Sequence, residues 1–368
     1  MTPPEQEEGA APDGLMDELA DAAPAPSRRR LWRRALAITA GMLCSLVLVA
    51  VGGLYVLSDR LMGNIERIPS VFASLDPDQR PARPAGQASQ GTTFLLAGSD
   101  SLAGEPTTGT SGEDRLFQPG AQRSDAIMLV RLNTTHPEAT VVSIPRDSWV
   151  PVPGHGTTKI NAAYAYGGPT LLVQTIERLT GVRVDHFATI DFAGFRAIVD
   201  AVDGIDVTVA ARTTFGPVVF TPGINHLDGR RALAYVRQRK GLPRGDLDRV
   251  QRQQSALRAL MDKTVSSGLL GDPAQLYQLL SAVTRFVGVD DTLSDDDLLS
   301  LAANMRSLRP SDVTFMTAPV TGTGYEGDQS VVYLDKVRAP LLWDAVEHDT
   351  VHGYLALNGG DTLGGSPR

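Results

Sequence analysis

The chain has 368 residues, of which 42% are hydrophobic and 21% are charged. This composition is typical of a globular protein with room for one large domain and additional segments. The formal net charge of −8 argues against a general attraction to nucleic acids. The only cysteine, Cys44, lies inside an apolar run, so disulfides and thiol catalysis are excluded from the rest of the chain.

The N-terminal part predicts a single membrane span. Residues 1–27 carry seven acidic and no basic side chains together with several prolines, a composition that cannot bury a core. Five arginines follow between residues 28 and 34, and residues 35–57 are then uncharged. We therefore predict a disordered acidic cytoplasmic tail with a basic flank over 1–34 and a transmembrane anchor over 35–57.

The predicted anchor has the length and the flanking charge of a membrane helix. At a rise of about 1.5 Å per residue, it is long enough to cross a bilayer core of roughly 30 Å. The positive-inside rule keeps the N-terminus in the cytoplasm and places the rest of the chain outside the cytoplasmic membrane. A cleaved signal peptide is the alternative, but its apolar region is usually shorter than this one.

The exported part divides into a linker, a large domain and a tail. Residues 58–91, rich in Pro, Gly, Gln and Ala, predict the linker, 92–350 the domain and 351–368 a flexible tail. Apolar runs bounded by turn signals predict strands at 94–97, 126–132, 140–144, 186–190, 206–209 and 313–316. Helical patterns alternate with them at 169–180, 192–202, 230–236, 246–266, 273–286 and 294–307. The alternation predicts an α/β fold in which a mixed central sheet is flanked by helices in three layers.

Arginines and aspartates gather in five short blocks of this domain, at 98–100, 123–125, 144–147, 237–239 and 246–253. No cysteine or histidine cluster accompanies them, and the chain has no Gly-x-Ser-x-Gly elbow and no phosphate loop ending in Gly-Lys-Ser/Thr. Residues 230–258 hold nine Arg or Lys against two Asp, an excess of seven positive charges. A basic segment in an acidic protein indicates a discrete anion site, and a solvated basic face is the alternative. Arginines with carboxylates also suit a metal-assisted site for a phosphorylated substrate.

The two early aspartates are candidate metal ligands. Asp100 follows a buried-type strand and a glycine, a usual place for a functional carboxylate, although it also suits a turn or cap. Asp125 immediately precedes the next predicted strand. Two carboxylates on neighbouring strand ends can hold one hard cation such as Mg²⁺.

Arginines at the ends of two elements are candidate phosphate ligands. Arg146 follows a strand that Pro145 ends, where a guanidinium can fork onto a phosphate or form an ion pair with Asp125 or Asp147. Arg237 and Arg239 are two residues apart, which places both on one side of an extended chain but not of a helix. Because Gly241 and Pro243 follow, we predict an extended segment.

The helix predicted at 246–266 carries polar side chains on one face. Asp246, Arg249 and Gln253 are spaced three and four residues apart, so they share that face. We predict that Arg249 and Gln253 point into the site. For Asp246, a helix cap and a chemical role are equally compatible with its position. Lys159 is a weaker candidate for the same anion.

In this order and over about residues 92–350, the blocks resemble the LytR-CpsA-Psr family of cell-wall glycopolymer ligases. The matching segments are LLAGSD at 95–100, RSDAIML at 123–129, VSIPRDS at 142–148, KINAAYAYGG at 159–168, LDGRRALAYVRQR at 227–239 and GDLDRVQRQQ at 245–254. An anchor followed by an exported domain is also this family's arrangement.

The resemblance implies a transferase that moves a glycopolymer from a polyprenyl pyrophosphate carrier to a muramic acid 6-hydroxyl of peptidoglycan. The polymer could be teichoic acid, capsule or arabinogalactan. By position, Asp100 and Asp125 correspond to ligands of Mg²⁺ (or Mn²⁺). Arg146, Arg237, Arg239 and Gln253 correspond to pyrophosphate ligands, and Arg123 matches as another ligand or as a support for Asp125. Asp100 or Asp246 is the candidate base. The family also implies a tunnel for the lipid tail between the sheet and the helices, and the apolar faces of 169–202 and 246–286 suit either this tunnel or ordinary core packing.

Three other functions compete with this one. A hydrolase would use the same site with water in place of the sugar hydroxyl. A regulator that touched DNA would need a basic cytoplasmic domain, which the acidic tail does not supply. A passive wall-binding module would leave the Arg and Asp blocks unexplained. We therefore expect peptidoglycan and membrane lipid, and no nucleic acid, as partners.

Overall fold

The computed structural model describes residues 60–86, 91–101, 122–133, 136–266, 272–305 and 307–364. At residues 100, 101, 122, 123 and 266 the description covers the backbone alone. The predicted cytoplasmic tail and membrane anchor lie outside the described residues. No helix within these described ranges combines the length and the apolar character needed to span a bilayer.

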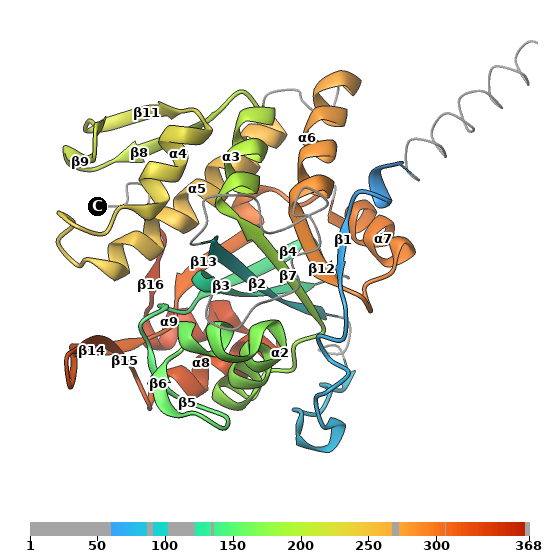
Figure 1. The fold of residues 1–368 in the computed structure, drawn as a ribbon, viewed down its shortest axis with the longest axis vertical. Coiled ribbons are helices and arrows are strands. Elements are labelled where there is room, and N and C mark those ends of the chain that lie inside the picture. The colour runs from blue at the N-terminus through green and yellow to red at the C-terminus, as the bar shows by residue number, and fades with distance from the viewer. Residues whose placement is uncertain are drawn as a thin grey trace, which may run out of the picture. The chain divides into compact units, whose positions relative to one another are not determined.

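An eight-stranded mixed sheet forms the centre of the fold (Figure 1). In spatial order its strands are β1 (Glu66–Ile68), β12 (Val287–Asp290), β7 (His186–Asp191), β2 (Gly91–Ser101), β3 (Gln122–Asn133), β4 (Glu138–Ser143), β13 (Val313–Thr317) and β16 (Asp361–Thr362). β2 runs parallel to β7 and antiparallel to β3, and β4 runs parallel to β13. The mixed sheet that the sequence predicts is therefore confirmed.

The central strands are apolar on both faces because helices cover the sheet on both sides. In β2, Leu95 and Ala97 belong to one core cluster, whereas Phe94 packs in another on the opposite face. Strands buried in this way appear in the sequence as continuous apolar runs and not as alternating patterns. Leu95 pairs with Leu129 of β3, so the most buried positions of the two strands coincide.

Two helical layers cover the sheet (Figure 1). The core on one face includes residues of α2 (Asn161–Thr180), α8 (Arg338–Glu347) and α9 (Val351–Asn358). Residues of α5 (Asp246–Ser266) and α7 (Asp295–Met305) pack against the other face. A further cluster joins α5 to α3 (Phe192–Ala201), α4 (Gly229–Arg237) and α6 (Pro273–Phe286). Two 3₁₀ turns, Pro77–Gln79 and Pro310–Asp312, complete the described helices.

Four two-stranded ribbons lie outside the central sheet. They pair β5 (Trp149–Val152) with β6 (Gly156–Lys159), β8 (Ile205–Val209) with β11 (Gly223–Leu227), β9 (Thr213–Phe215) with β10 (Val218–Phe220), and β14 (Val320–Glu326) with β15 (Gln329–Leu334). The strand predicted at 206–209 forms, but it pairs with β11 and not with the central sheet. Most of these short strands were not predicted, because they lie in turn-rich segments where the sequence shows no strand pattern.

The structure differs from the sequence prediction in two segments, the expected linker and the expected flexible tail. In the expected linker, β1 pairs with β12, and Val71 and Leu75 are buried in the core. In the expected flexible tail, α9 packs on α8 and β16 pairs with β13. Both segments are short of apolar residues, but each contributes a few that the core buries, which a composition average does not reveal.

Candidate functional site

The site lies at the sheet edge where β2 ends, β3 begins and β4 ends. Asp125 is the fourth residue of β3, next to a register shift between Gly98 and Ser99 of β2. β4 ends at Ser143, and the chain turns through Pro145, whose carbonyl accepts a hydrogen bond from the Ser148 amide. The turn presents Arg146 beside Asp125. The sequence therefore brings a carboxylate and a guanidinium together from adjacent strands.

Arg146 is surrounded by carboxylates. It forms a hydrogen-bonded ion pair with Asp125, and its Nε lies 4.0 Å from Asp147 Oδ2 and 3.8 Å from Asp246 Oδ1. Burial alone would lower the pKa of Arg146, but the three carboxylates together raise it. The guanidinium therefore stays charged. The ion-pair interpretation of Arg146 is confirmed, and the same side chain also lines the cavity described below.

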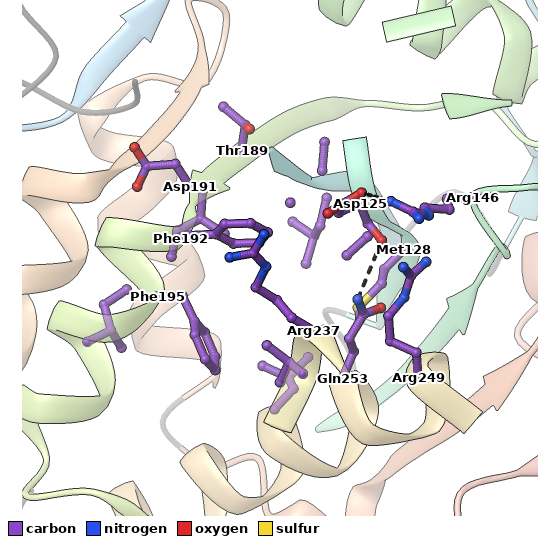
Figure 2. A pocket seen from close by; sticks show the side chains of 18 of the residues that line it. Asp125, Met128, Arg146, Thr189, Asp191, Phe192, Phe195, Arg237, Arg249 and Gln253 are labelled. Carbon is purple, nitrogen blue, oxygen red and sulfur yellow. Dashed lines mark hydrogen bonds and ion pairs between the residues drawn. The ribbon is translucent and has the colours of Figure 1, made fainter. Parts of the chain in front are cut away.

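The first turns of α5 supply three further polar groups, of which Figure 2 shows Arg249 and Gln253. Arg249 Nη2 lies 2.5 Å from Asp246 Oδ1, and both side chains are buried. Burial raises the pKa of Asp246 and lowers that of Arg249. Gln253 donates to the backbone carbonyl of Asp125 at 3.4 Å. Among the described atoms, neither oxygen of Asp246 accepts a hydrogen bond, so Asp246 acts in ion pairs and not as a cap.

The two arginines at the end of α4 point to different partners. Arg237 is the last residue of the helix, and its guanidinium lies 4.5 Å from the centre of the Phe192 ring. Figure 2 shows this stacking. Arg239 Nη1 instead lies 3.8 Å from Asp147 Oδ2. The predicted extended segment is thus wrong for Arg237, because α4 continues to that residue and only Gln238 turns to an extended conformation.

Asp147 is a functional candidate that the sequence offered only as a partner for Arg146. Its side chain is 11% exposed and lies near three cations. Besides Arg146 and Arg239, it contacts Lys159, whose Nζ is 3.4 Å from Asp147 Oδ1. Its position directly after Arg146 in the strand-end turn was the available signal. Lys159, a weak candidate from sequence, is placed in the site by this contact.

A large apolar cavity opens beside these charges. Its volume is about 820 Å³, and it lies between the sheet face of β2, β3 and β7 and the helices α3, α5 and α6. Apolar lining includes Leu96, Met128, Phe195, Leu257 and Val283. α2 does not line it, so of the two alternatives left open for 169–180, a lipid tunnel or an ordinary core, the structure shows core packing. Its neighbour in sequence, α3, does line it, and so does α5 from the second predicted segment.

The described charges of the site have a positive sum. Six cations face four carboxylates, which leaves a net charge of +2. The cations are Arg146, Lys159, Arg237, Arg239, Lys240 and Arg249, and the carboxylates are Asp125, Asp147, Asp191 and Asp246. A doubly charged pyrophosphate diester would neutralise this excess.

Asp191 was not predicted as a residue of the site. It caps α3 by accepting from the Gly194 amide at 2.8 Å, and its position between a strand and a helix is the sequence signal for such a cap.

The family model for the LytR_cpsA_psr family matches residues 71–344. The chain belongs to this family. The match covers all the described residues of the site.

Relatives and solved structures agree with this LytR_cpsA_psr assignment. Cell wall biosynthesis protein LcpA of Corynebacterium glutamicum is 36% identical over 285 residues, 68% of this chain and 54% of that protein. A Bacillus mycoides protein named polyisoprenyl-teichoic acid–peptidoglycan teichoic acid transferase TagU is 31% identical over 246 residues, 67% of this chain and 73% of that protein. The solved structure of TagT bound to LIIa-WTA is 27% identical, with a TM-score of 0.57, and the match covers 76% of this chain and 98% of that one. The chain spans less than two thirds of the corynebacterial relatives, at 54% of LcpA and 64% of LcpB.

The structure brings most of the predicted site residues together. The residues that line this same cavity are Asp125, Arg146, Arg237, Arg239, Arg249 and Gln253. For Asp100 and Arg123 the backbones pair across β2 and β3 at the same sheet edge, and their side chains lie outside the described atoms. Their roles in this LytR_cpsA_psr member stay predictions.

Proposed function

We propose that the chain is a membrane-anchored, extracytoplasmic phosphotransferase that moves a glycopolymer from a polyprenyl pyrophosphate carrier to the muramic acid 6-hydroxyl of peptidoglycan. One observation carries the proposal: a cavity of about 820 Å³ with apolar walls opens onto an array of arginines. An apolar tail joined to a pyrophosphate is the ligand that such a site fits. The names of the TagU and TagT relatives support the same class of substrate.

In this reaction the protein mainly neutralises charge and has little covalent chemistry of its own to perform. The acceptor oxygen attacks the phosphorus that carries the polymer, the bond to the prenyl phosphate breaks, and a phosphodiester joins polymer to peptidoglycan. Arg146, Arg239 and Arg249 stabilise the charge that develops on the phosphates. The hydroxyl proton goes to a carboxylate, Asp100 or Asp246, and from there to solvent. Burial raises the pKa of Asp246, which favours its holding a proton.

A divalent cation, Mg²⁺ or Mn²⁺, is part of the proposal. Asp125 presents a carboxylate at the cavity, and carboxylate oxygens suit such hard cations. The described residues contain no group of three or more acidic, histidine or cysteine side chains able to hold a metal. In this proposal Asp125 and Asp100 would hold the cation together with substrate phosphate oxygens. When bound, it would supply further positive charge beside the pyrophosphate.

The test compares three variants of the full-length protein in vesicles that contain a lipid pyrophosphate-linked glycan, with peptidoglycan present. Arg146→Ala and Arg239→Ala should each lower transfer by about 100-fold or more, because each removes a charge from the transition state. Arg230→Ala is the matched control, since Arg230 is an exposed arginine of the same helix as Arg237. Thermal unfolding checks that the variants keep the fold.

Near-normal transfer by either site variant would refute the assignment. Omitting peptidoglycan separates the proposed transferase from the alternative hydrolase. A polymer phosphate released at the same rate without the acceptor would favour hydrolysis at the same site. A protein that binds the donor with no turnover in either case would favour the non-catalytic envelope regulator.

A further inference from the structure

Arg252 of α5 is the largest fully buried side chain among the described residues, with an exposed fraction of 0%. Its neighbours on the helix, Arg249 and Gln253, line the cavity, but Arg252 does not. Burial lowers the pKa of Arg252, which shows that the interior disfavours its charge. An apolar side chain of similar volume often stabilises a fold equally well at such a position, so packing alone does not account for an arginine.

The guanidinium of Arg252 contacts two other elements. Its Cζ lies 4.6 Å from the centre of the Tyr235 ring and 5.6 Å from that of Phe220. Nη1 donates to Gln238 Oε1 at 2.7 Å, and Nη2 donates to Thr213 Oγ1 at 2.9 Å. Tyr235 and Gln238 belong to the C-terminal end of α4, and Thr213 begins β9. Arg252 therefore links α5 to both of these elements.

Gln238 extends this link to the cavity. Its neighbours in the chain are Arg237 and Arg239, which both line the cavity. The Gln238 side chain is buried, and its Nε2 donates to the carbonyls of Thr214 at 3.1 Å and Lys240 at 3.4 Å. Thr214 and Lys240 are cavity residues as well. One buried amide thus joins two parts of the cavity wall, β9 and the segment that follows α4.

The segment that carries Arg239 has little regular structure of its own. Helix α4 ends at Arg237, and Gly241 has a left-handed backbone with a φ of 79°. The residues between them belong to neither a helix nor a strand. Side-chain hydrogen bonds such as those of Gln238 therefore matter for where this segment lies.

We propose that Arg252 is a positioning residue of the donor site, which holds Gln238 and thereby fixes Arg237 and Arg239 at the cavity. The expected effect on transfer rests on the proposed function. A guanidinium suits this role because its planar fork bonds two side chains while its face stacks on aromatic rings. A lysine would supply the charge without the fork.

The first test measures the segment itself and needs no turnover. Arg252→Met removes the fork and leaves a flexible apolar side chain that can pack on the same two rings. Hydrogen exchange followed by mass spectrometry on the full-length protein compares peptides covering 213–216 and 237–242 with those of the central sheet. We expect exchange in the first two peptides to become about tenfold faster, while the sheet stays protected.

Arg131→Met is the matched control, because Arg131 is another buried arginine, 3% exposed. It lies toward the opposite end of β3 from Asp125 and bonds Asp349 and the Gly91 carbonyl. This variant should leave exchange in 213–216 and 237–242 as it is. Unchanged exchange there in Arg252→Met, or equally faster exchange across the whole domain, would overturn the proposal and make Arg252 an ordinary core residue.

The second test measures transfer from a lipid pyrophosphate-linked glycan to peptidoglycan. Arg252→Met and Gln238→Leu should each slow transfer by roughly 10- to 100-fold, because small displacements of binding groups are costly to the rate. The double variant should be no slower than the slower single variant, since both changes remove the same hydrogen bond. Arg252→Lys should stay at least several-fold slow, and Arg131→Met should remain near the wild-type rate.

Three kinetic results would overturn the proposal. They are near-normal transfer by Arg252→Met, losses that multiply in the double variant, and a full rate with Arg252→Lys, which would mean that charge alone matters. Failure of the proposed function gives a different result. If the wild-type protein transferred no polymer from any lipid pyrophosphate donor, that function would be refuted, and the exchange measurement would still decide whether Arg252 holds the segment.

Discussion

Asp147 illustrates how a residue that is itself negative can serve an anion site. It lies among Arg146, Lys159 and Arg239, at distances between 3.4 and 4.0 Å from their charged nitrogens. Such a carboxylate does not attract a pyrophosphate, but it limits where three long side chains can go. We infer that Asp147 is a positioning residue, comparable with the outer groups that orient the ligands of a metal.

The substitution Asp147→Asn tests this role because it keeps the shape and removes the charge. With the restraint gone, the cations lose their orientation, so kcat should fall by roughly 10- to 100-fold. KM for the lipid donor should stay the same or decrease, because one negative charge near an anionic substrate is lost. Steady-state kinetics with a lipid pyrophosphate donor measure both quantities. Asp335→Asn, which affects a carboxylate paired with Arg338 on α8, is the control. A raised KM with unchanged kcat would contradict the positioning role.

At the level of residues, the sequence predicted which charged groups form the site better than it predicted how they are arranged. Arg146, Arg249 and Gln253 line the predicted site because each follows a recognisable strand end or shares a helix face. Phe192 could not be recognised as the ring beneath Arg237. It reads as an ordinary apolar residue of α3, and only the packing of α3 against α4 brings the two side chains together.

At the level of elements, the shape of the cavity depends on how closely α3 approaches α6. Gly194 of α3 lies against α6, and a Cβ built on it would meet the Phe286 Cβ at 2.6 Å and the Phe286 carbonyl oxygen at 3.2 Å. A methyl group has no room there unless the two helices separate. Because the next residue, Phe195, lines the cavity, a shift of α3 would also alter the shape of the cavity.

Gly194→Ala should therefore destabilise the protein by about 1–3 kcal/mol, despite the higher helix propensity of alanine. Gly353→Ala is the matched control, because Gly353 also lies in a helix and a Cβ there would meet nothing within 4 Å. That change should stabilise the protein by roughly 0.5–1 kcal/mol. Denaturant unfolding of the two variants measures the difference. If Gly194→Ala were also stabilising, the close contact between α3 and α6 would be wrong.

The elements also show why a cavity is invisible in sequence. Leu257 of α5 and Val283 of α6 have the helical spacing of core residues, and their apolar faces look the same whether they meet another side chain or an open space. The sequence therefore predicted the helices, while the distance between layers that leaves about 820 Å³ open came only from the structure. α2 has the same kind of apolar face and packs in an ordinary core.

For the molecule as a whole, the segment after the predicted anchor is part of the folded domain and not a free spacer. Arg80 bonds both carboxylate oxygens of Glu177 in α2, donates to the Val184 carbonyl at 2.6 Å, and stacks on Phe72. The side chains of the Arg80–Glu177 pair are 12% and 3% exposed. This pair fixes residues 60–86 to the domain and so fixes the distance between the site and the start of the described chain.

Arg80→Ala should lower the free energy of unfolding by about 3–5 kcal/mol, because it leaves the buried Glu177 carboxylate without its cation. Arg83→Ala, which removes a 69% exposed arginine paired with Asp185, should cost no more than about 1 kcal/mol. Thermal or denaturant unfolding of the full-length protein compares the two. Equal, small losses would mean that residues 60–86 attach only loosely to α2. A large loss for Arg80→Ala alone would mean that the Arg80–Glu177 pair holds residues 60–86 firmly against α2.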